Sequence, residues 1–185
     1  MLHMEQENYK LEIVNELLRG SNHMREIARL LKTNHMRIVR EINALEKKNV
    51  VDYKQEGKNK VYFLKKTLEA KNYVFTTENY KLHKLLIKYH LLRRIIEEIQ
   101  KNNKIKLAVI FGSYAKGNPK EDSDIDLYIE TEDFNLKKEV KKINTKLSIK
   151  IGKYNKSSLL IREIEKNHVI VKGVELYYEK NKFFE

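Results

Sequence analysis

The chain has 185 residues and a formal net charge of +12, with 38 lysines and arginines against 26 aspartates and glutamates. It has no cysteine, which excludes disulfide bonds and cysteine-based zinc sites. No apolar run approaches the roughly 20 residues of a membrane-spanning helix, and the first residues lack a signal-peptide pattern, so we expect a cytoplasmic protein. The positive charge permits nucleic-acid binding, but it is spread along the chain and does not locate a binding face.

The first thirty residues have the pattern of two short helices. Leucine and valine residues recur at three- and four-residue spacing over residues 8–18, which predicts a helix that ends before Gly20. Ser21 or Asn22 can cap a second helix, because their side-chain oxygens accept hydrogen bonds from the backbone N–H groups that a helix start leaves free.

A third helix and a β-hairpin are predicted next. Thr33 or Asn34 can cap a helix over residues 35–48, in which apolar residues again recur on one side. Apolar runs then flank the polar, glycine-containing segment 55–59, which predicts a hairpin with a basic tip. Three helices followed by a hairpin, over residues 1–66, resemble a winged helix-turn-helix domain.

This resemblance implies binding to double-stranded DNA. The third helix of such a domain enters the major groove, and lysines on the hairpin, or wing, meet backbone phosphates. The alternative is that the domain mediates protein contact or dimerisation and that its charges are only solvated; a homodimer is compatible with either interpretation. We favour DNA, and the expected contacts are His35, Arg37, Arg40, Lys54, Lys58 and Lys60.

The middle of the chain is predicted to be helical. Thr67 can cap a helix that stops at a break over residues 76–78. A long amphipathic helix then follows over residues 78–101, with leucine and isoleucine side chains along one side. We expect residues 67–79 to connect the N-terminal domain to a second domain over residues 80–185.

The chemistry is expected where two strands meet a polar turn. An apolar run that ends at Phe111 predicts a buried strand, which Gly112 and Ser113 interrupt. Gly112 permits close backbone approach, and Ser113 can cap a short helix whose free N–H groups would suit a phosphate. Asp124 and Asp126 open the next strand. Since alternate strand residues share a face, these two carboxylates should project together, and oxygen ligands suit Mg²⁺.

Gly112-Ser113, ten further residues and then Asp124-x-Asp126 resemble the Gly-Ser-x10-Asp-x-Asp signature of minimal nucleotidyltransferases in the DNA polymerase β-like superfamily. The resemblance implies an α+β domain with a small mixed sheet. In that family, metal ions assist attack of an acceptor hydroxyl on the α-phosphate of a nucleoside triphosphate. By position, Asp124 and Asp126 would be catalytic and bind Mg²⁺, while Gly112 and Ser113 would bind ATP or another NTP. Lys116 could approach a phosphate or simply lie in solvent.

The family usually has a third carboxylate on the strand after the next helix, and this chain departs from that pattern. Residues 136–145 predict the helix and residues 147–151 the strand, on which Ser148 and Lys150 share a face. The third acid commonly helps to bind the catalytic metal and to activate the acceptor, and general-base help is worth about 10²–10⁴-fold. Its absence predicts slow transfer, a base supplied by partner or substrate, or no transfer.

Two functions therefore remain open for a two-domain α+β protein with a winged helix and a polymerase β-like domain. The first is Mg²⁺-dependent transfer of NMP to an unknown acceptor, such as a partner protein, coupled to DNA binding. The second is a transcription regulator whose nucleotidyltransferase-like domain only senses nucleotide or binds a partner. The missing third carboxylate favours the second function, and the retained Gly-Ser pair and both aspartates favour the first.

Overall fold

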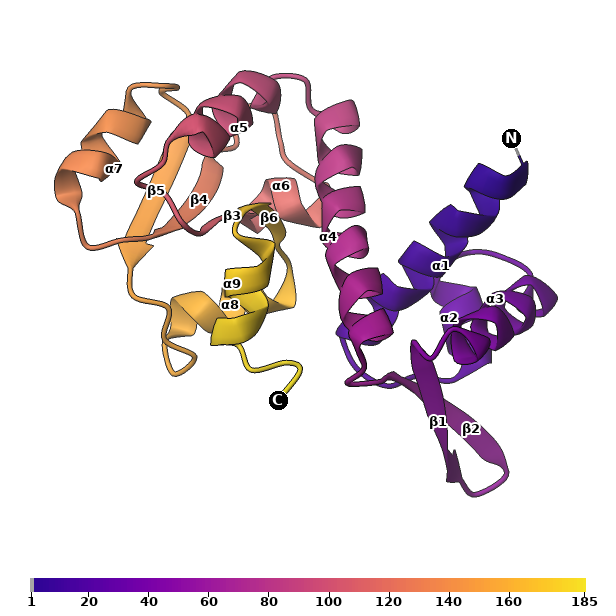
Figure 1. Ribbon diagram of the computed structural model, residues 1–185. Helices are drawn as coiled ribbons and strands as arrows, with labels where there is room; N and C mark the ends of the chain where they lie inside the picture. The colour runs from indigo at the N-terminus through magenta and orange to yellow at the C-terminus, as the bar shows by residue number, and fades with distance from the viewer. Residues whose placement is uncertain (1) are drawn as a thin grey trace. The chain divides into compact units, whose positions relative to one another are not determined.

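The computed structural model describes residues 2–185, and it describes side chains from residue 8 onward. The chain divides into two compact units: the first ends at Thr77 and also includes residues 184–185, and the second spans Glu78–Phe183 (Figure 1). Buried apolar side chains occur in both units. None of the helices in the described part of the chain is both long and apolar enough to cross a lipid bilayer.

The first unit consists of helices packed beside a β-hairpin. Its elements before the long helix are α1 (Leu2–Leu18), α2 (Met24–Leu30), α3 (His35–Lys47), β1 (Val51–Glu56) and β2 (Asn59–Leu64). Both α1 and α2 pack against α3, and buried isoleucine and leucine side chains lie among these helices. The two strands are antiparallel and are joined by the two-residue turn Gly57–Lys58.

The caps of α2 and α3 differ in how well they were predicted. Asn34 caps α3 as expected, because its side-chain oxygen accepts a hydrogen bond from the backbone N–H of Met36 at 2.7 Å. The prediction that Ser21 or Asn22 caps α2 was wrong, since the N-cap residue is His23 and its side chain makes no capping bond. Asn22 instead forms an isolated antiparallel bridge to Tyr62 of the hairpin.

The helical middle of the chain breaks at a different place from the one predicted. Thr67 accepts a hydrogen bond from the N–H of Ala70 at the start of α4 (Leu68–Lys88), which confirms its capping role. The break expected at residues 76–78 is absent, and the hydroxyls of Thr76 and Thr77 donate to carbonyls four residues earlier within α4. The expected single helix over 78–101 is interrupted after Lys88, and α5 (Leu92–Lys101) follows.

The second unit contains a small mixed sheet, as predicted. Its strands are β3 (Ala108–Phe111), β4 (Ile125–Glu130), β5 (Leu147–Gly152) and β6 (Val169–Lys172). The strand order in space is β5-β4-β3-β6; the pair β4 and β5 is parallel, and the other pairs are antiparallel. A parallel pair needs a crossover connection, and a helix supplies it here.

Short helices connect and follow these strands. They are α6 (Gly112–Lys116), α7 (Phe134–Lys141), α8 (Leu159–Lys166) and α9 (Val174–Lys180). The crossover helix α7 begins earlier than predicted, because Asp133 caps it by accepting a hydrogen bond from the N–H of Asn135 at 2.8 Å. Phe134 and Asn135 are therefore helical, and the interpretation of these residues as a break was wrong.

The two faces of strand β4 have different roles. Ile125, Leu127 and Ile129 are buried in a cluster with apolar residues of α5 and α7. Asp126 and Tyr128 lie on the opposite face, because side chains alternate along a strand. The apolar face that packs against α5 and α7 thus fixes the register of β4, and the register in turn fixes where the Asp126 carboxylate projects.

Candidate functional site

The fold brings the two halves of the Gly-Ser and Asp-x-Asp motif together. Phe111, the last residue of β3, pairs with Asp126 of β4, and the chain turns sharply at Gly112 into α6. Gly112 has φ +69°, a conformation that side chains rarely adopt, and a Cβ built on it would lie well under 3 Å from Asp126 Oδ2. The backbone of the Gly-Ser turn therefore packs directly against a carboxylate that follows it by more than ten residues.

The other residues of this motif are less enclosed. Asp126 is half-buried, whereas Asp124 is exposed and lies just before β4, which begins at Ile125. Ser113 is half-buried within the first turn of α6. The prediction that Ser113 caps this helix was wrong, because α6 already begins at Gly112 and its N-cap is Phe111, which makes no side-chain capping bond.

Two lysines lie at the far end of α6. Lys116 Nζ is 3.0 Å from Glu163 Oε1 of α8, and the hydrogen bond from Lys116 lowers the pKa of Glu163. A phosphate at Lys116 would therefore compete with this carboxylate. Lys88, which was not predicted as a site residue, donates a hydrogen bond from Nζ to the carbonyl of Gly117 at 2.7 Å. Nothing in the sequence pattern distinguishes Lys88 from the other lysines of its helix.

The position expected for a third carboxylate is occupied by a serine. In the parallel pair of strands, Asp126 is aligned with Ser148, and Tyr128 is aligned with Lys150. Among the described residues, no group of three or more histidine, cysteine, aspartate or glutamate side chains is placed to hold a metal ion. The two aspartates nevertheless suit Mg²⁺, which proteins commonly bind through one or two carboxylates together with substrate phosphates.

The expected DNA contacts on α3 make contacts inside the first unit. The guanidinium of Arg37 lies 4.6 Å from the centroid of the Tyr9 ring. Arg40 Nη2 lies 3.2 Å from Oε1 of Glu41, a carboxylate that is almost completely buried. Since a buried charge without a partner is strongly destabilising, substitution of Arg40 would affect folding as well as any contact with DNA.

The hairpin lysines are exposed, and two of them have partners within the hairpin, Lys54 on its own strand and Lys60 on the neighbouring strand. Lys54 Nζ is 2.7 Å from Oε1 of Glu56, and Lys60 Nζ lies 3.7 Å from the centroid of the Tyr53 ring. Lys58 occupies the turn between the strands. These positions leave all three amines at the surface, where ion pairs with solvent-exposed partners are weak.

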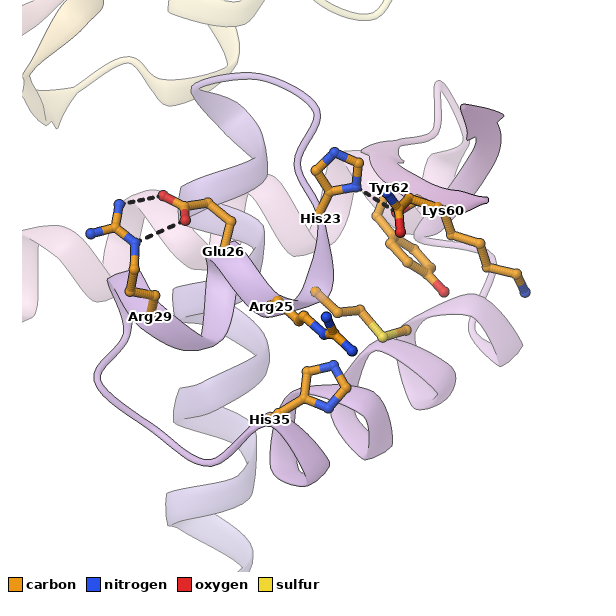
Figure 2. Close-up of a pocket in the computed structure, with 9 residues that line it drawn as sticks. His23, Arg25, Glu26, Arg29, His35, Lys60 and Tyr62 are labelled. Atoms are coloured by element: carbon orange, nitrogen blue, oxygen red, sulfur yellow. Dashed lines mark hydrogen bonds and ion pairs between the residues drawn. The ribbon is translucent and has the colours of Figure 1, made fainter. Parts of the chain in front are cut away.

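A cavity of about 530 Å³ lies in the first unit and includes two of the expected DNA contacts, His35 and Lys60 (Figure 2). It was not apparent from the sequence, because its walls come from α2, the start of α3 and strand β2. The bridge between Asn22 and Tyr62 holds the beginning of α2 beside the hairpin. The residues that line the cavity are His23, Met24, Arg25, Glu26, Arg29, His35, Asn59, Lys60 and Tyr62.

A buried ionic cluster in the second unit lies outside the motif. Glu78 of α4 is completely buried; its carboxylate is 2.9 Å from Lys81 Nζ and accepts a hydrogen bond from the hydroxyl of Tyr178 at 2.7 Å. His168 Nε2 lies 3.6 Å from Oε1 of Glu78. Burial raises the pKa of Glu78, but Lys81 and His168 together outweigh that effect and lower it to about 2.

A comparison with protein families matches part of the second unit. Residues 93–177, which include Gly112, Ser113 and both aspartates, match the family model described as "Polymerase beta, Nucleotidyltransferase". A further similarity, 50% identity over 40 residues, relates the chain to a "Putative protein adenylyltransferase" of Methanocaldococcus jannaschii. That alignment covers 22% of this chain and 46% of the relative, so the chain spans less than half the length of the curated protein it matches. Residues 93–177 thus match a polymerase β-like nucleotidyltransferase domain.

Proposed function

We propose that the second unit is a Mg²⁺-dependent nucleotidyltransferase that transfers NMP from ATP or another NTP to an acceptor. The observation that carries this proposal is the contact between the Gly112 backbone and the Asp126 carboxylate, in a segment that matches the family. Only glycine fits there without displacing the carboxylate. Such a turn lets nucleotide phosphates approach the backbone beside the residues that would bind metal.

Each residue of the motif has a role in this proposal. Asp124 and Asp126 would hold Mg²⁺, which would polarise the α-phosphate and neutralise charge that develops on it. Gly112 and Ser113 would orient the triphosphate through backbone N–H groups and the serine hydroxyl. Lys116 would exchange its ion pair with Glu163 for a phosphate oxygen. The acceptor hydroxyl forms a bond to the α-phosphorus, and pyrophosphate leaves.

The acceptor is proposed to be a protein, and the transferred group to be AMP. The name of the relative from Methanocaldococcus jannaschii supports this choice. Because Ser148 cannot act as a carboxylate base, the proton of the acceptor hydroxyl would pass to a base on the partner or to water.

We also propose that the first unit is a winged helix-turn-helix domain that binds double-stranded DNA. The order of three helices and a hairpin supports this proposal. The exposed lysines of the hairpin support it too, as does the cavity that residues of α3 and β2 line together. A homodimer would suit a two-fold symmetric DNA site.

The experiment that tests the transferase is a calorimetric titration of ATP, CTP, GTP and UTP with and without Mg²⁺. We expect one nucleotide to bind only with Mg²⁺, and the Asp124→Asn/Asp126→Asn variant to lose that binding. Incubation with labelled nucleotide and cell extract then tests for transfer to a protein. If no nucleotide binds at millimolar concentration, the transferase proposal fails.

The second candidate is a transcription regulator whose second unit binds nucleotide without turnover. The specific observation in its favour is the alignment of Ser148, rather than an acid, with Asp126. It predicts Mg²⁺-dependent nucleotide binding, no labelled product with any acceptor, and a change in DNA affinity when nucleotide is present. Release of pyrophosphate that depends on Asp126 would contradict it.

A further inference from the structure

The cavity of the first unit brings together basic side chains from three elements. Arg25 belongs to α2, His35 is the first residue of α3, and Lys60 belongs to β2. Figure 2 shows the guanidinium of Arg25 beside the ring of His35, although ten residues separate them in the chain. Two nitrogen-rich groups thus face the same space.

The basic side chains that line this cavity are not equally available to an external anion. Arg29 is held by Glu26, the one carboxylate among the lining residues, through hydrogen bonds of 2.8 Å and 2.5 Å. Lys60 Nζ lies over the ring of Tyr53, away from Arg25 in Figure 2. Within the described part of the chain, neither Arg25 nor His35 forms an ion pair with a carboxylate. These two side chains therefore remain for an external anion.

We propose that this cavity is a phosphate-binding site and that Arg25 is its principal ligand, with His35 as the second. A guanidinium presents a planar fork of N–H donors that matches two phosphate oxygens, and an imidazole can donate a further hydrogen bond. The volume of about 530 Å³ exceeds what a bare phosphate needs and leaves room for an attached sugar.

The phosphate can come from a DNA backbone or from a free mononucleotide, and the position of the cavity favours DNA. This inference rests on the proposed DNA binding of the first unit. His35 and Lys60, which line the cavity, were already expected to contact DNA from the resemblance to a winged helix. Through Arg25, the inference adds helix α2 to the proposed DNA-binding surface. One phosphate would be held between the start of α2, the start of α3 and the hairpin.

The test uses the full chain and the variant Arg25→Gln, with Arg29→Gln as the matched control. Both arginines are exposed residues of α2 that line the cavity, but Arg29 is already paired with Glu26. Binding of a fluorescent mixed-sequence duplex is measured by anisotropy over a range of salt concentrations. We expect Arg25→Gln to weaken binding about tenfold and to reduce the salt slope by about one, because one phosphate contact is lost. Arg29→Gln should change affinity less than about twofold.

A second titration separates the two phosphate sources. AMP is titrated without Mg²⁺ into the Asp124→Asn/Asp126→Asn variant, so that metal-dependent binding in the second unit does not contribute, with and without Arg25→Gln. Arg25-dependent duplex binding without AMP binding supports the site and assigns it to the DNA backbone. Arg25-dependent AMP binding without duplex binding supports the site but contradicts the proposed DNA function. If Arg25→Gln and Arg29→Gln behave alike towards both probes, the phosphate site is overturned.

Discussion

At the scale of single residues, Gly112 links the strand β3 to the carboxylate of Asp126. Two requirements coincide there: a positive φ and the absence of a Cβ. A left-handed conformation alone costs about 1–3 kcal/mol for a residue with a side chain. In addition to this backbone strain, a Cβ at position 112 would clash with the carboxylate of Asp126.

These two effects can be separated with Gly112→Ala and Gly57→Ala. Gly57, in the hairpin turn, has φ +59° and open space where a Cβ would lie. We expect both variants to lose some stability, but only Gly112→Ala to weaken Mg²⁺-dependent nucleotide binding, by about tenfold or more, because Asp126 must move. Calorimetry of each variant with the preferred nucleotide checks this. Equal nucleotide binding in both variants would show that Gly112 acts through backbone conformation alone.

Ser148 is the residue at which a third carboxylate can be restored. Since Ser148 is aligned with Asp126 on a parallel strand, the two side chains share a face. We expect Ser148→Asp to bind Mg²⁺ more tightly and to raise the rate of pyrophosphate release about 10- to 100-fold, because a metal ligand and general base are added. Ser148→Asn, which has similar shape without the charge, is the control. A rate unchanged by Ser148→Asp would mean that this position does not limit transfer.

At the scale of elements, helix α4 is tied to the second unit by the buried cluster around Glu78. Its pKa, lowered to about 2, lies below the value near 4.5 of a free glutamate. The carboxylate therefore stabilises the fold above pH 4.5, and this contribution disappears as the pH falls towards 2. Its full size is on the order of 3 kcal/mol.

We therefore expect Glu78→Gln to lower the free energy of unfolding at pH 7, and the difference from wild type to shrink between pH 4.5 and pH 2. Urea denaturation of both proteins at several pH values measures this difference in the free energy of unfolding. Glu175→Gln, at an exposed position of α9, is the control and should show no such trend. A difference that stays constant down to pH 2 would contradict the lowered pKa.

Elements with a clear hydrophobic period were predicted well, and their boundaries less so. The strands β3 and β5 and the helix α3 lie close to where apolar spacing placed them. The break expected at Thr76 and Thr77 failed because threonine is compatible with a helix when its hydroxyl bonds to the carbonyl four residues earlier. Spacing alone does not report that bond.

The candidate functional residues were predictable only where the parts of a site lie close together in the sequence. The approach of Gly112 to Asp126 follows from a motif whose parts are close in sequence and joined by adjacent strands. The cavity around Arg25 follows from no such motif, because it depends on how α2 packs beside strand β2, where Lys60 lies thirty-five residues further along the chain. The pairing of Lys116 with Glu163 likewise joins helices that no local pattern connects.

At the scale of the whole molecule, α4 contributes residues to both units. Leu68–Thr77 belong to the first unit and Glu78–Lys88 to the second, and the helix is continuous across this boundary. We propose that a ligand bound to one unit influences the other through this shared helix. The two proposed activities would then be thermodynamically linked, and linkage is reciprocal.

We expect Mg²⁺ with the preferred nucleotide to change the affinity for duplex DNA by about fivefold, and the duplex to change the nucleotide affinity by the same factor. The two factors are obtained from anisotropy titrations with and without nucleotide, and from calorimetry with and without duplex. The Asp124→Asn/Asp126→Asn variant should show unchanged duplex affinity in the presence of nucleotide, since it lacks the proposed metal ligands. A nucleotide-dependent change in duplex affinity would favour a regulator that responds to nucleotide, and the reciprocal change in nucleotide affinity must then follow. Independent binding of the two ligands would instead indicate that the first unit only localises a transferase on DNA.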